Sequence, residues 1–315
     1  MEHDIQIGGW RLGAVAGVSI KKSVEALSDT AVVTLPGSYA GVALDVEECL
    51  KEGDAVTIRL GYGNRLATEF EGFLKSVKTD DGTIQLECED ALYLLRVGVE
   101  NKEYKNIKVG DLLNKIAGQV GGGIGVRCDY DFRYDKFVVK DATGWDVLKK
   151  VQEETKANIY FKGETLHVHP QYSEIFNAQA VVYDFSSNVE ESSLTYKRAD
   201  ERSYLVEVEG IGADGKRVSV SHGRTGGDKR SLKVYGVSDV ASLKKRAEEE
   251  LVSLVYEGFD GSFTGWLVPY CEPGYKVTLR DAEYPSKNGN YYVVATEVSF
   301  GPDGGKRTVT IGKKI

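Results

Sequence analysis

The chain has 315 residues, of which 41% are hydrophobic and 28% charged, so it is long enough for two or three domains and is not a disordered polymer. Its net charge of -8 argues against a general nucleic-acid binder, and its four widely spaced cysteines, with no Cys-x-x-Cys, argue against a zinc ribbon, a thioredoxin-type site and a disulfide scaffold. No apolar run is long enough for a membrane span, and the start lacks the basic and apolar regions of a secretory signal, so we expect synthesis in the cytoplasm.

Alternating apolar and polar residues predict strands throughout residues 1–90. The candidate strands are near 4–7, 15–24, 29–36, 56–60, 70–78 and 83–88. The last two are predicted to form a hairpin around Asp80-Asp81-Gly82, where the glycine tolerates positive φ. Asp90 is placed to cap a short helix through Leu92 and Leu95.

Residues 104–170 predict a compact α+β module. Apolar residues at helical spacing indicate a first helix near 109–120 that ends at Gly121–Gly123, and a capping-box pattern at Thr143-Gly144-Trp145-Asp146 begins a second helix. The expected order is helix, two strands, helix, two strands, with strands near 125–128, 136–139, 158–161 and 165–168. The last two strands are expected to form a hairpin about Gly163.

Residues 180–315 return to strands, interrupted by one long helix. A hairpin is predicted from 203–209 and 217–221, and the helix near 239–256 carries an apolar stripe and ends at Gly258. Further strands are expected near 262–268, 276–280, 291–300 and 307–311.

A repeat links the two ends of the chain. Gly53–Arg59 matches Gly274–Arg280 at the Gly, Val, Thr and Arg positions, and 17 residues after each Gly an aromatic residue, Phe70 or Tyr291, opens the next strand. Each copy then turns at an Asp-Gly pair, at 81–82 and at 303–304. We interpret the two segments as copies of one β-barrel.

The predicted fold class is therefore mainly β with an α+β insertion, in which two similar β-barrel domains flank a small helix-strand-strand-helix-strand-strand module. The expected domains are a first barrel at 1–100, the module at 101–170 and a second barrel at 201–315, which contains the long helix. Residues 171–200 either complete the first barrel or begin the second.

His167 and His169 are the best candidates for metal ligands. Positions i and i+2 of a strand face the same way, so both imidazoles can reach one ion if the fold supplies Cys128 or Glu164 as a further ligand. The competing interpretation is a pair of surface histidines on a hairpin strand. Asp129, Asp131 and Asp135 resemble a sparse calcium loop but lack its central Gly and closing Glu, so we interpret Asp131-Phe132-Arg133 as a polar turn.

The sequence predicts no enzyme, no catalytic residue and no cofactor. Neither Gly-x-Ser-x-Gly nor His-Glu-x-x-His occurs, and the glycines at 121–125 follow a helix, whereas a phosphate loop precedes one. Glu87, Glu89 and Asp90 form the closest group of acids, which we interpret as strand-face acids followed by a helix cap.

Residues 222–230 form a basic, glycine-rich stretch. We expect a mobile loop there, in which Arg224, Lys229 and Arg230 contact a phosphate-bearing or protein partner; a merely solvated loop is the alternative.

Four loose motifs in a fixed order carry a resemblance to a known family. They are Gly53-Asp54-x-Val56-x-Ile58-x-Leu60-Gly61-Tyr62 with Phe70-x-Gly72; Leu86-Glu87-Cys88-Glu89-Asp90-Ala91; Trp145-Asp146-Val147-Leu148 with Ile159-Tyr160-Phe161; and Pro273-Gly274-Tyr275-x-Val277 with Asn288-Gly289-x-Tyr291-Tyr292-Val293. The pattern resembles the tail or baseplate hub proteins of contractile-tailed phages and prophages, including the late control gene D type.

The resemblance implies a non-enzymatic structural protein of the virion tail or baseplate. Such hubs are homotrimers whose six barrels form a pseudo-sixfold ring, and here the ring is expected to join the tail tube protein to a separate spike protein, without sequence-specific nucleic-acid binding. A domesticated injection system is equally compatible with the sequence. Two other hypotheses stay open: a cell-wall or glycan-binding module, and a wall hydrolase that uses Glu87, Glu89 or Asp90.

Overall fold

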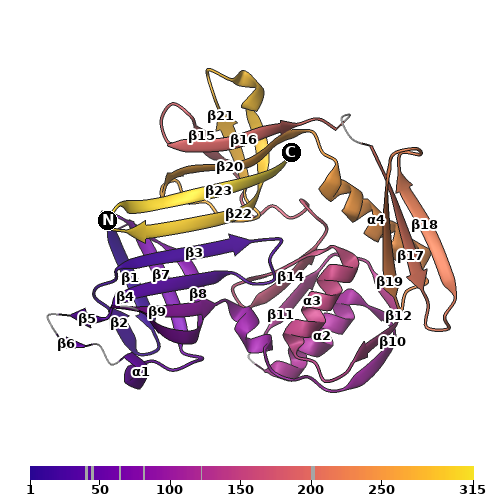
Figure 1. Cartoon of the computed structure of the whole chain (residues 1–315), viewed down its shortest axis with the longest axis horizontal. Helices are drawn as coiled ribbons and strands as arrows, with labels where there is room; N and C mark the ends of the chain where they lie inside the picture. Colours follow the sequence, from indigo (N-terminus) through magenta and orange to yellow (C-terminus); the bar gives the residue numbers. More distant parts are fainter. Residues whose placement is uncertain (40–41, 44–45, 64, 81, 122, 200–202) are drawn as a thin grey trace. The chain divides into compact units, whose positions relative to one another are not determined.

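The computed structural model describes residues 1–39, 42–43, 46–63, 65–80, 82–121, 123–199 and 203–315 (Figure 1). By their internal contacts, the residues form two compact units. The first unit consists of Met1–Tyr93, Ile175–Thr195 and Asp260–Ile315, and the second of Leu94–Glu174 and Tyr196–Phe259. The compact units divide the chain at other points than the expected domains do, because residues 196–259 cluster with the central module. The domain boundaries expected from the sequence stay a prediction.

The first half of the first unit is built from strands that place alternating apolar residues in a core. Its elements are β1 (Glu2–Ile7), β2 (Trp10–Leu12), β3 (Gly17–Ser23), β4 (Thr30–Pro36), β5 (Ser38–Tyr39), β6 (Val42–Ala43), α1 (Val46–Cys49), β7 (Ala55–Tyr62), β8 (Arg65–Asp80), β9 (Thr83–Glu89) and the 3-10 helix η1 (Ala91–Leu95). The six predicted strands are confirmed, whereas β2, β5, β6 and α1 were not expected. Asp81 of the predicted hairpin turn lies outside the described residues.

The second half of the first unit contains the four predicted C-terminal strands and two more. Its elements are β15 (Val181–Asp184), β16 (Glu191–Lys197), β20 (Gly258–Trp266), β21 (Lys276–Arg280), the 3-10 helix η2 (Pro285–Lys287), β22 (Gly289–Gly301) and β23 (Gly304–Lys314). β15 runs parallel to β21, and β16 lies beside β20. Residues 171–200 were expected to complete either the first or the second barrel. Their strands, β15 and β16, pair with strands of the second half.

The two halves have matching strand orders. The first half runs β3-β4-β9-β8-β7-β1 and the second β16-β20-β23-β22-β21-β15, and both belong to one 13-stranded sheet in which β3 pairs with β22 (Figure 1). The halves differ at one end, where β1 is antiparallel to β7 but β15 is parallel to β21. The predicted fold class, mainly β with two similar barrel halves and an α+β insertion, is confirmed.

A β-bulge marks the equivalent positions in the two halves. The N–H groups of Gly53 and Gly274 donate to the carbonyls of Leu74 and Val293, each at 2.8 Å. The ladder to the next strand slips by one residue immediately after both of these positions, between Leu74 and Ser76 and between Val293 and Ala295. Leu74 and Val293 are therefore equivalent, although their distances from the matched glycines along the sequence differ.

The equal spacing of the aromatic residues does not mark equivalent positions. Phe70 pairs with Ile58, whereas Tyr291 pairs with Val277, which is two positions nearer the matched glycine. The duplication is thus present, but its two copies have different registers after the first strand.

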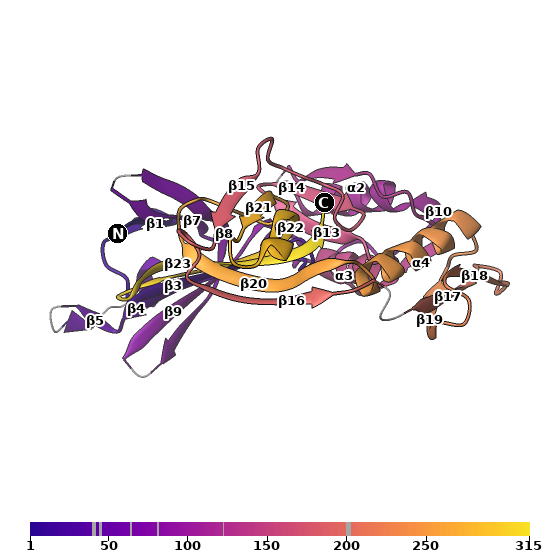
Figure 2. The same ribbon diagram turned by 90° about the horizontal axis from the view of Figure 1, so that it is seen from above.

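The second unit combines helices with three small sheets. Its elements are β10 (Lys102–Lys108), α2 (Val109–Val120), β11 (Gly125–Cys128), β12 (Arg133–Val139), α3 (Gly144–Thr155), β13 (Asn158–Lys162), β14 (Thr165–His169), β17 (Tyr204–Ile211), β18 (Arg217–Gly223), β19 (Asp228–Tyr235) and α4 (Val240–Leu254). The sheets are β10-β12, β11-β14-β13 and β18-β17-β19, and α4 lies along the last of them (Figure 2).

The helix ends of the second unit follow from capping residues. Thr143 and Asp146 form the predicted capping box of α3, and Asp239 accepts the N–H of Ser242 at the start of α4. α4 ends at Leu254, earlier than expected, and Gly258 instead begins β20. Gly122 of the predicted loop after α2 lies outside the described residues. Among the helices that the structure describes, none combines the length and apolarity needed to cross a membrane.

Candidate functional site

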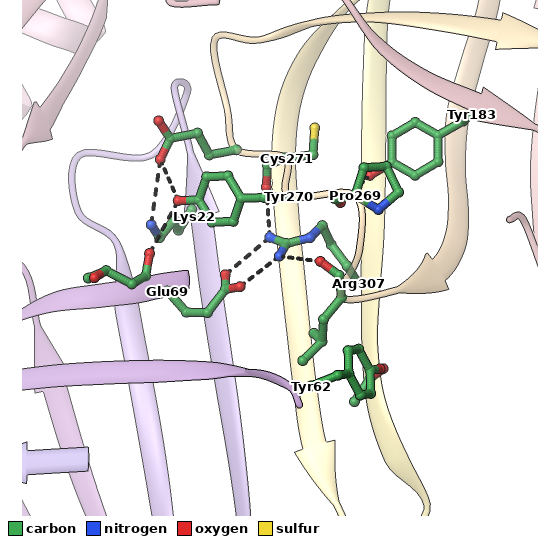
Figure 3. A network of polar contacts seen from close by, with 12 residues as sticks. Lys22, Tyr62, Glu69, Tyr183, Pro269, Tyr270, Cys271 and Arg307 are labelled. Carbon is green, nitrogen blue, oxygen red and sulfur yellow. Dashed lines mark hydrogen bonds and ion pairs between the residues drawn. The ribbon is translucent and has the colours of Figure 1, made fainter. Parts of the chain in front are cut away.

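A buried ion pair joins the two halves of the first unit (Figure 3). Arg307 on β23 donates from Nη1 to Glu69 Oε2 at 3.1 Å and from Nη2 to Glu69 Oε1 at 2.7 Å, and each side chain is 2% exposed. The same two nitrogens donate to the backbone carbonyls of Cys271 at 2.7 Å and Leu267 at 3.2 Å. The guanidinium is thus held by a carboxylate from β8 and by two carbonyls of the second half.

Tyr270 covers the ion pair. Its ring centroid is 5.0 Å from Arg307 Cζ, and its hydroxyl donates to Glu272 at 3.0 Å and lies 3.3 Å from the carbonyl of Thr68. Burial and the Glu272 carboxylate raise the pKa of Tyr270 well above its usual value. Burial opposes the charge of Arg307, but Glu69 outweighs it and raises the Arg307 pKa. The raised pKa of Tyr270 keeps its hydroxyl protonated, as a donor to Glu272.

Further side chains cross between the halves around this pair. The hydroxyl of Tyr62 donates to the carbonyl of Gly305 at 2.9 Å, and Lys22 Nζ is 3.9 Å from Glu272 (Figure 3). We call these contacts, together with the Glu69–Arg307 pair, the barrel junction. The junction links one half of the first unit to the other through side chains of both.

Glu69 and Arg307 were not expected from the sequence. The available signal was the strand pattern of β23, in which Arg307 alternates in phase with buried Val309 and Ile311. A charged residue on an apolar strand face needs a buried partner, but the pattern does not tell which acid provides it.

His167 and His169 lie on β14 and face the same way, as predicted, but the surface interpretation is wrong. His167 is 6% exposed and His169 is 1% exposed. His169 Nδ1 is 2.6 Å from Asp129 Oδ1, and His169 Nε2 is 3.0 Å from His167 Nδ1. Burial and the neighbouring His169 lower the pKa of His167 to about 4, so His167 is neutral at pH 7.

Glu174 completes this group, which we call the histidine cluster (Asp129, His167, His169 and Glu174). One ligand atom each from Asp129, His169 and Glu174 lie within 4.8 Å of one another. This set differs from the partners suggested by the sequence, Cys128 and Glu164. Asp129 was not among the expected partners of the histidines, and the parallel pairing of β11 with β14 brings it to them.

Arg224, Lys229 and Arg230 do not share one long loop. Lys229 and Arg230 lie on β19, where they pair with Glu207 at 2.7 Å and Glu250 at 3.2 Å, and only residues 224–227 form the turn from β18. The expected mobile stretch is therefore mostly strand. The role of the three basic residues in contacting a partner stays a prediction.

The acids Glu87, Glu89 and Asp90 have structural partners. Glu87 accepts from Ser76 and Lys78, and the Lys78 contact is the main cause that lowers the pKa of Glu87. Glu89 accepts from Ser28 at 3.2 Å.

Asp90 accepts the N–H groups of Asp29 at 2.8 Å and of Leu92 at 3.0 Å, so the predicted helix cap is confirmed. Burial and the charge of Asp29 raise the pKa of Asp90.

Solved structures with this fold come from bacterial and prophage tail proteins. The tail protein from Neisseria meningitidis MC58 is 14% identical with a TM-score of 0.71, and the alignment covers 98% of this chain and 95% of that one. The 43 kDa tail protein of prophage MuSo2 from Shewanella oneidensis is 14% identical with a TM-score of 0.70, covering 99% and 98%. The E. coli c3393 protein, a component of the type VI secretion system, is 12% identical with a TM-score of 0.62, covering 99% and 76%.

The sequence comparisons give a family. No curated protein matches the sequence. A family model described as the Alg8 N-terminal domain matches residues 3–199, which is more than half of the chain and runs from β1 past β16. The narrower resemblance to the late control gene D type stays a prediction. Because the family model matches more than half of its residues, the chain belongs to the Alg8 N-terminal domain family.

Proposed function

We propose that the chain is a structural tail or baseplate hub subunit of a phage or a phage-like injection apparatus. In this proposal three copies form a pseudo-sixfold ring that joins a hexameric tail tube to a separate trimeric spike. The observation that carries it is the matching strand order of the two halves, with the same bulge after Leu74 and Val293.

Symmetry is the physical reason why a duplicated chain suits this role. A tube with six-fold symmetry presents six equivalent contacts, whereas a trimer of a single-barrel protein offers only three. A trimer of a duplicated chain offers six similar surfaces to the tube and keeps true three-fold symmetry toward the spike.

The barrel junction supports the proposal, because the six surfaces need a constant spacing around a ring. The buried Glu69–Arg307 pair and the β3–β22 pairing hold the two halves of each chain in one arrangement. The tail proteins that share the fold are consistent with this role.

Light scattering over a wide concentration range tests the proposal. The expected result is a species near three times the subunit mass of 34.6 kDa, with six lobes around a central opening in electron micrographs. Arg307→Met is expected to reduce the trimer fraction by loosening the junction, and the matched control Lys21→Met, an exposed residue on β3, is expected to leave it unchanged.

A chain that stays monomeric at every concentration, shows no ring and is retained by purified cell walls would overturn the hub proposal. That outcome would favour the cell-wall-binding hypothesis, and retention on walls would then be measured for the Arg224→Ala variant.

A further inference from the structure

The histidine cluster of the second unit is not explained by a ring-forming role. We propose that it is a zinc site, in which His169 Nδ1 and the carboxylates of Asp129 and Glu174 bind one Zn²⁺ and water takes the fourth position. The inference is independent of the proposed function.

Strand pairing builds the site from distant parts of the sequence. β11 runs parallel to β14 with Cys128 opposite Val168, and the N–H of Asp129 donates to the carbonyl of Val168 at 3.2 Å. This register places Asp129 beside His169. Asp129 directly follows β11, His169 is the last residue of β14, and Glu174 lies in the segment that follows β14.

The hydrogen bonds of the two histidines determine which nitrogen can bind metal. His169 Nδ1 lies 2.6 Å from Asp129 Oδ1, and His169 Nε2 lies 3.0 Å from His167 Nδ1, so a His169 proton on Nδ1 points to the carboxylate and leaves Nε2 to accept from His167. When zinc replaces the proton on Nδ1, His169 carries its proton on Nε2 and donates it to His167 Nδ1, and His167 in turn carries its own proton on Nε2. His167 then accepts from Nε2 of His169 and so holds the ring of the ligating histidine in place. Such a hydrogen bond to the second nitrogen of a ligating histidine is common at metal sites.

The ligand atoms need only small movements to bind an ion. Two donors on a tetrahedral zinc, each about 2.0–2.1 Å from the metal, lie about 3.3 Å apart. The 2.6 Å contact must therefore open slightly and Glu174 must approach. Arg127 now pairs with Glu174 at 2.9 Å, but its side chain is 62% exposed and can turn into water.

The donor set favours zinc over Mg²⁺ and Ca²⁺. One imidazole nitrogen with two carboxylates is a mixed nitrogen and oxygen set, whereas Mg²⁺ and Ca²⁺ prefer oxygen alone. A bound zinc would fasten the segment that carries Glu174, the last residue of its stretch in the second unit, to the β11-β14-β13 sheet. Its role would be structural.

Metal titration of the whole chain tests the site. A Cys49→Ser background removes the exposed thiol, and Zn²⁺ binding is measured by calorimetry and by competition with a chromophoric chelator. We expect about one zinc per chain, a rise in Tm with zinc, and the intense visible absorption of tetrahedral Co²⁺ when cobalt is used as the probe.

Variants separate the cluster from unspecific binding. Glu174→Gln changes a residue of the segment after β14 and should lower zinc affinity at least tenfold while leaving the metal-free Tm within a few degrees. Asp129→Asn and His169→Asn should abolish the cobalt absorption. The matched controls Asp131→Asn and His222→Asn should bind zinc like the parent chain.

Equal zinc affinity in the parent chain and in Glu174→Gln would overturn the proposal, as would less than a few tenths of a zinc per chain at saturation. A site that binds Mn²⁺ but no Zn²⁺ would overturn the assignment of the ion.

Discussion

Glu69 and Arg307 lie 238 positions apart in the chain, and their side chains form a buried, bidentate ion pair. Removing two charges from water costs several kcal/mol for each ion, and close geometry with additional hydrogen bonds is needed to offset that cost. Here the carbonyls of Leu267 and Cys271 supply the additional bonds. Loss of either partner leaves the other charge buried and uncompensated.

Arg307→Met should therefore lower the free energy of unfolding by about 3–5 kcal/mol. The reason is the buried Glu69 carboxylate, which would lose both hydrogen bonds to the guanidinium and gain no water in their place. Urea unfolding followed by circular dichroism measures the change, and the double variant Glu69→Met with Arg307→Met should recover part of the loss.

An exposed ion pair across the β3–β22 pairing, which also joins the two halves, is the matched control. Lys21 on β3 is opposite Glu297 on β22, with Nζ and Oε1 3.4 Å apart and side chains 66% and 52% exposed. Lys21→Met should cost at most about 1 kcal/mol. If Arg307→Met costs no more than Lys21→Met, the junction does not depend on the buried pair.

Two glycines of the second unit should respond oppositely to alanine. A Cβ on Gly210 of β17 would lie 2.4 Å from the carbonyl of Val237 and 2.7 Å from Leu243 of α4, whereas a Cβ on Gly118 of α2 would meet nothing within 4 Å. Gly210→Ala should lower the free energy of unfolding by about 1–3 kcal/mol through overpacking. Gly118→Ala should raise it by about 0.5–1 kcal/mol, because alanine favours the helix.

Thermal unfolding of both variants beside the parent chain measures these changes. A Gly210→Ala chain as stable as the parent would mean that α4 can move away from its sheet at little cost.

Elements with a clear apolar period could be predicted from the sequence, and those without one could not. α2, α3 and the strands of residues 1–90 were predicted because their buried residues recur at the helical or strand period. β10 was not predicted, because its buried residues, Tyr104 and Ile107, are three positions apart and do not follow the strand period of two. β19 was not predicted, because most of its residues are exposed.

The contacts that build the sites could not be predicted from local patterns. The spacing of His167 and His169 showed that they share a face, but their burial and their contact with Asp129 depend on the parallel pairing of β11 with β14. Likewise, nothing near Glu69 in the sequence indicates Arg307. Such contacts depend on which strands pair in the folded protein, and the alternation of apolar and polar residues along one strand does not encode that pairing.

A buried pair on α4 should make stability depend on pH. Arg246 donates from Nη1 to Glu250 Oε2 at 2.9 Å, and both side chains are 7% exposed. Burial raises the pKa of Glu250, but the hydrogen bond and charge of Arg246 outweigh burial and lower it below the usual value. A carboxyl whose folded-state pKa is lowered stabilises the protein above its unfolded pKa, and that stability is lost as the pH falls through the folded pKa.

Glu250→Gln should therefore lower the free energy of unfolding by about 2–3 kcal/mol at pH 7, and the difference should shrink below about pH 4. Unfolding curves at a series of pH values measure the difference, with Glu153→Gln, an exposed acid on α3, as the control. A difference that is constant with pH would show that packing, and not the charge, accounts for the loss.

Three of the four thiols should differ in reactivity, and the difference reports on the barrel junction. Cys49 is exposed, whereas burial raises the pKa of Cys88 and of Cys271 to about 12. Because the thiolate is the reactive form, a pKa near 12 leaves about one thiol in 10,000 ionised at pH 8. Ellman's reagent should therefore label Cys49 quickly, and Cys88 and Cys271 only after unfolding.

Cys271 provides a direct test of the junction, since its carbonyl accepts from Arg307 at 2.7 Å. In a Cys49→Ser background, Arg307→Met should speed the labelling of Cys271 at least tenfold while the labelling of Cys88 changes less, because Cys88 is buried in the core of the first half. Equal acceleration at both thiols would mean that the variant loosens the whole first unit. Unchanged labelling of Cys271 would mean that the two halves stay joined by the β3–β22 pairing alone.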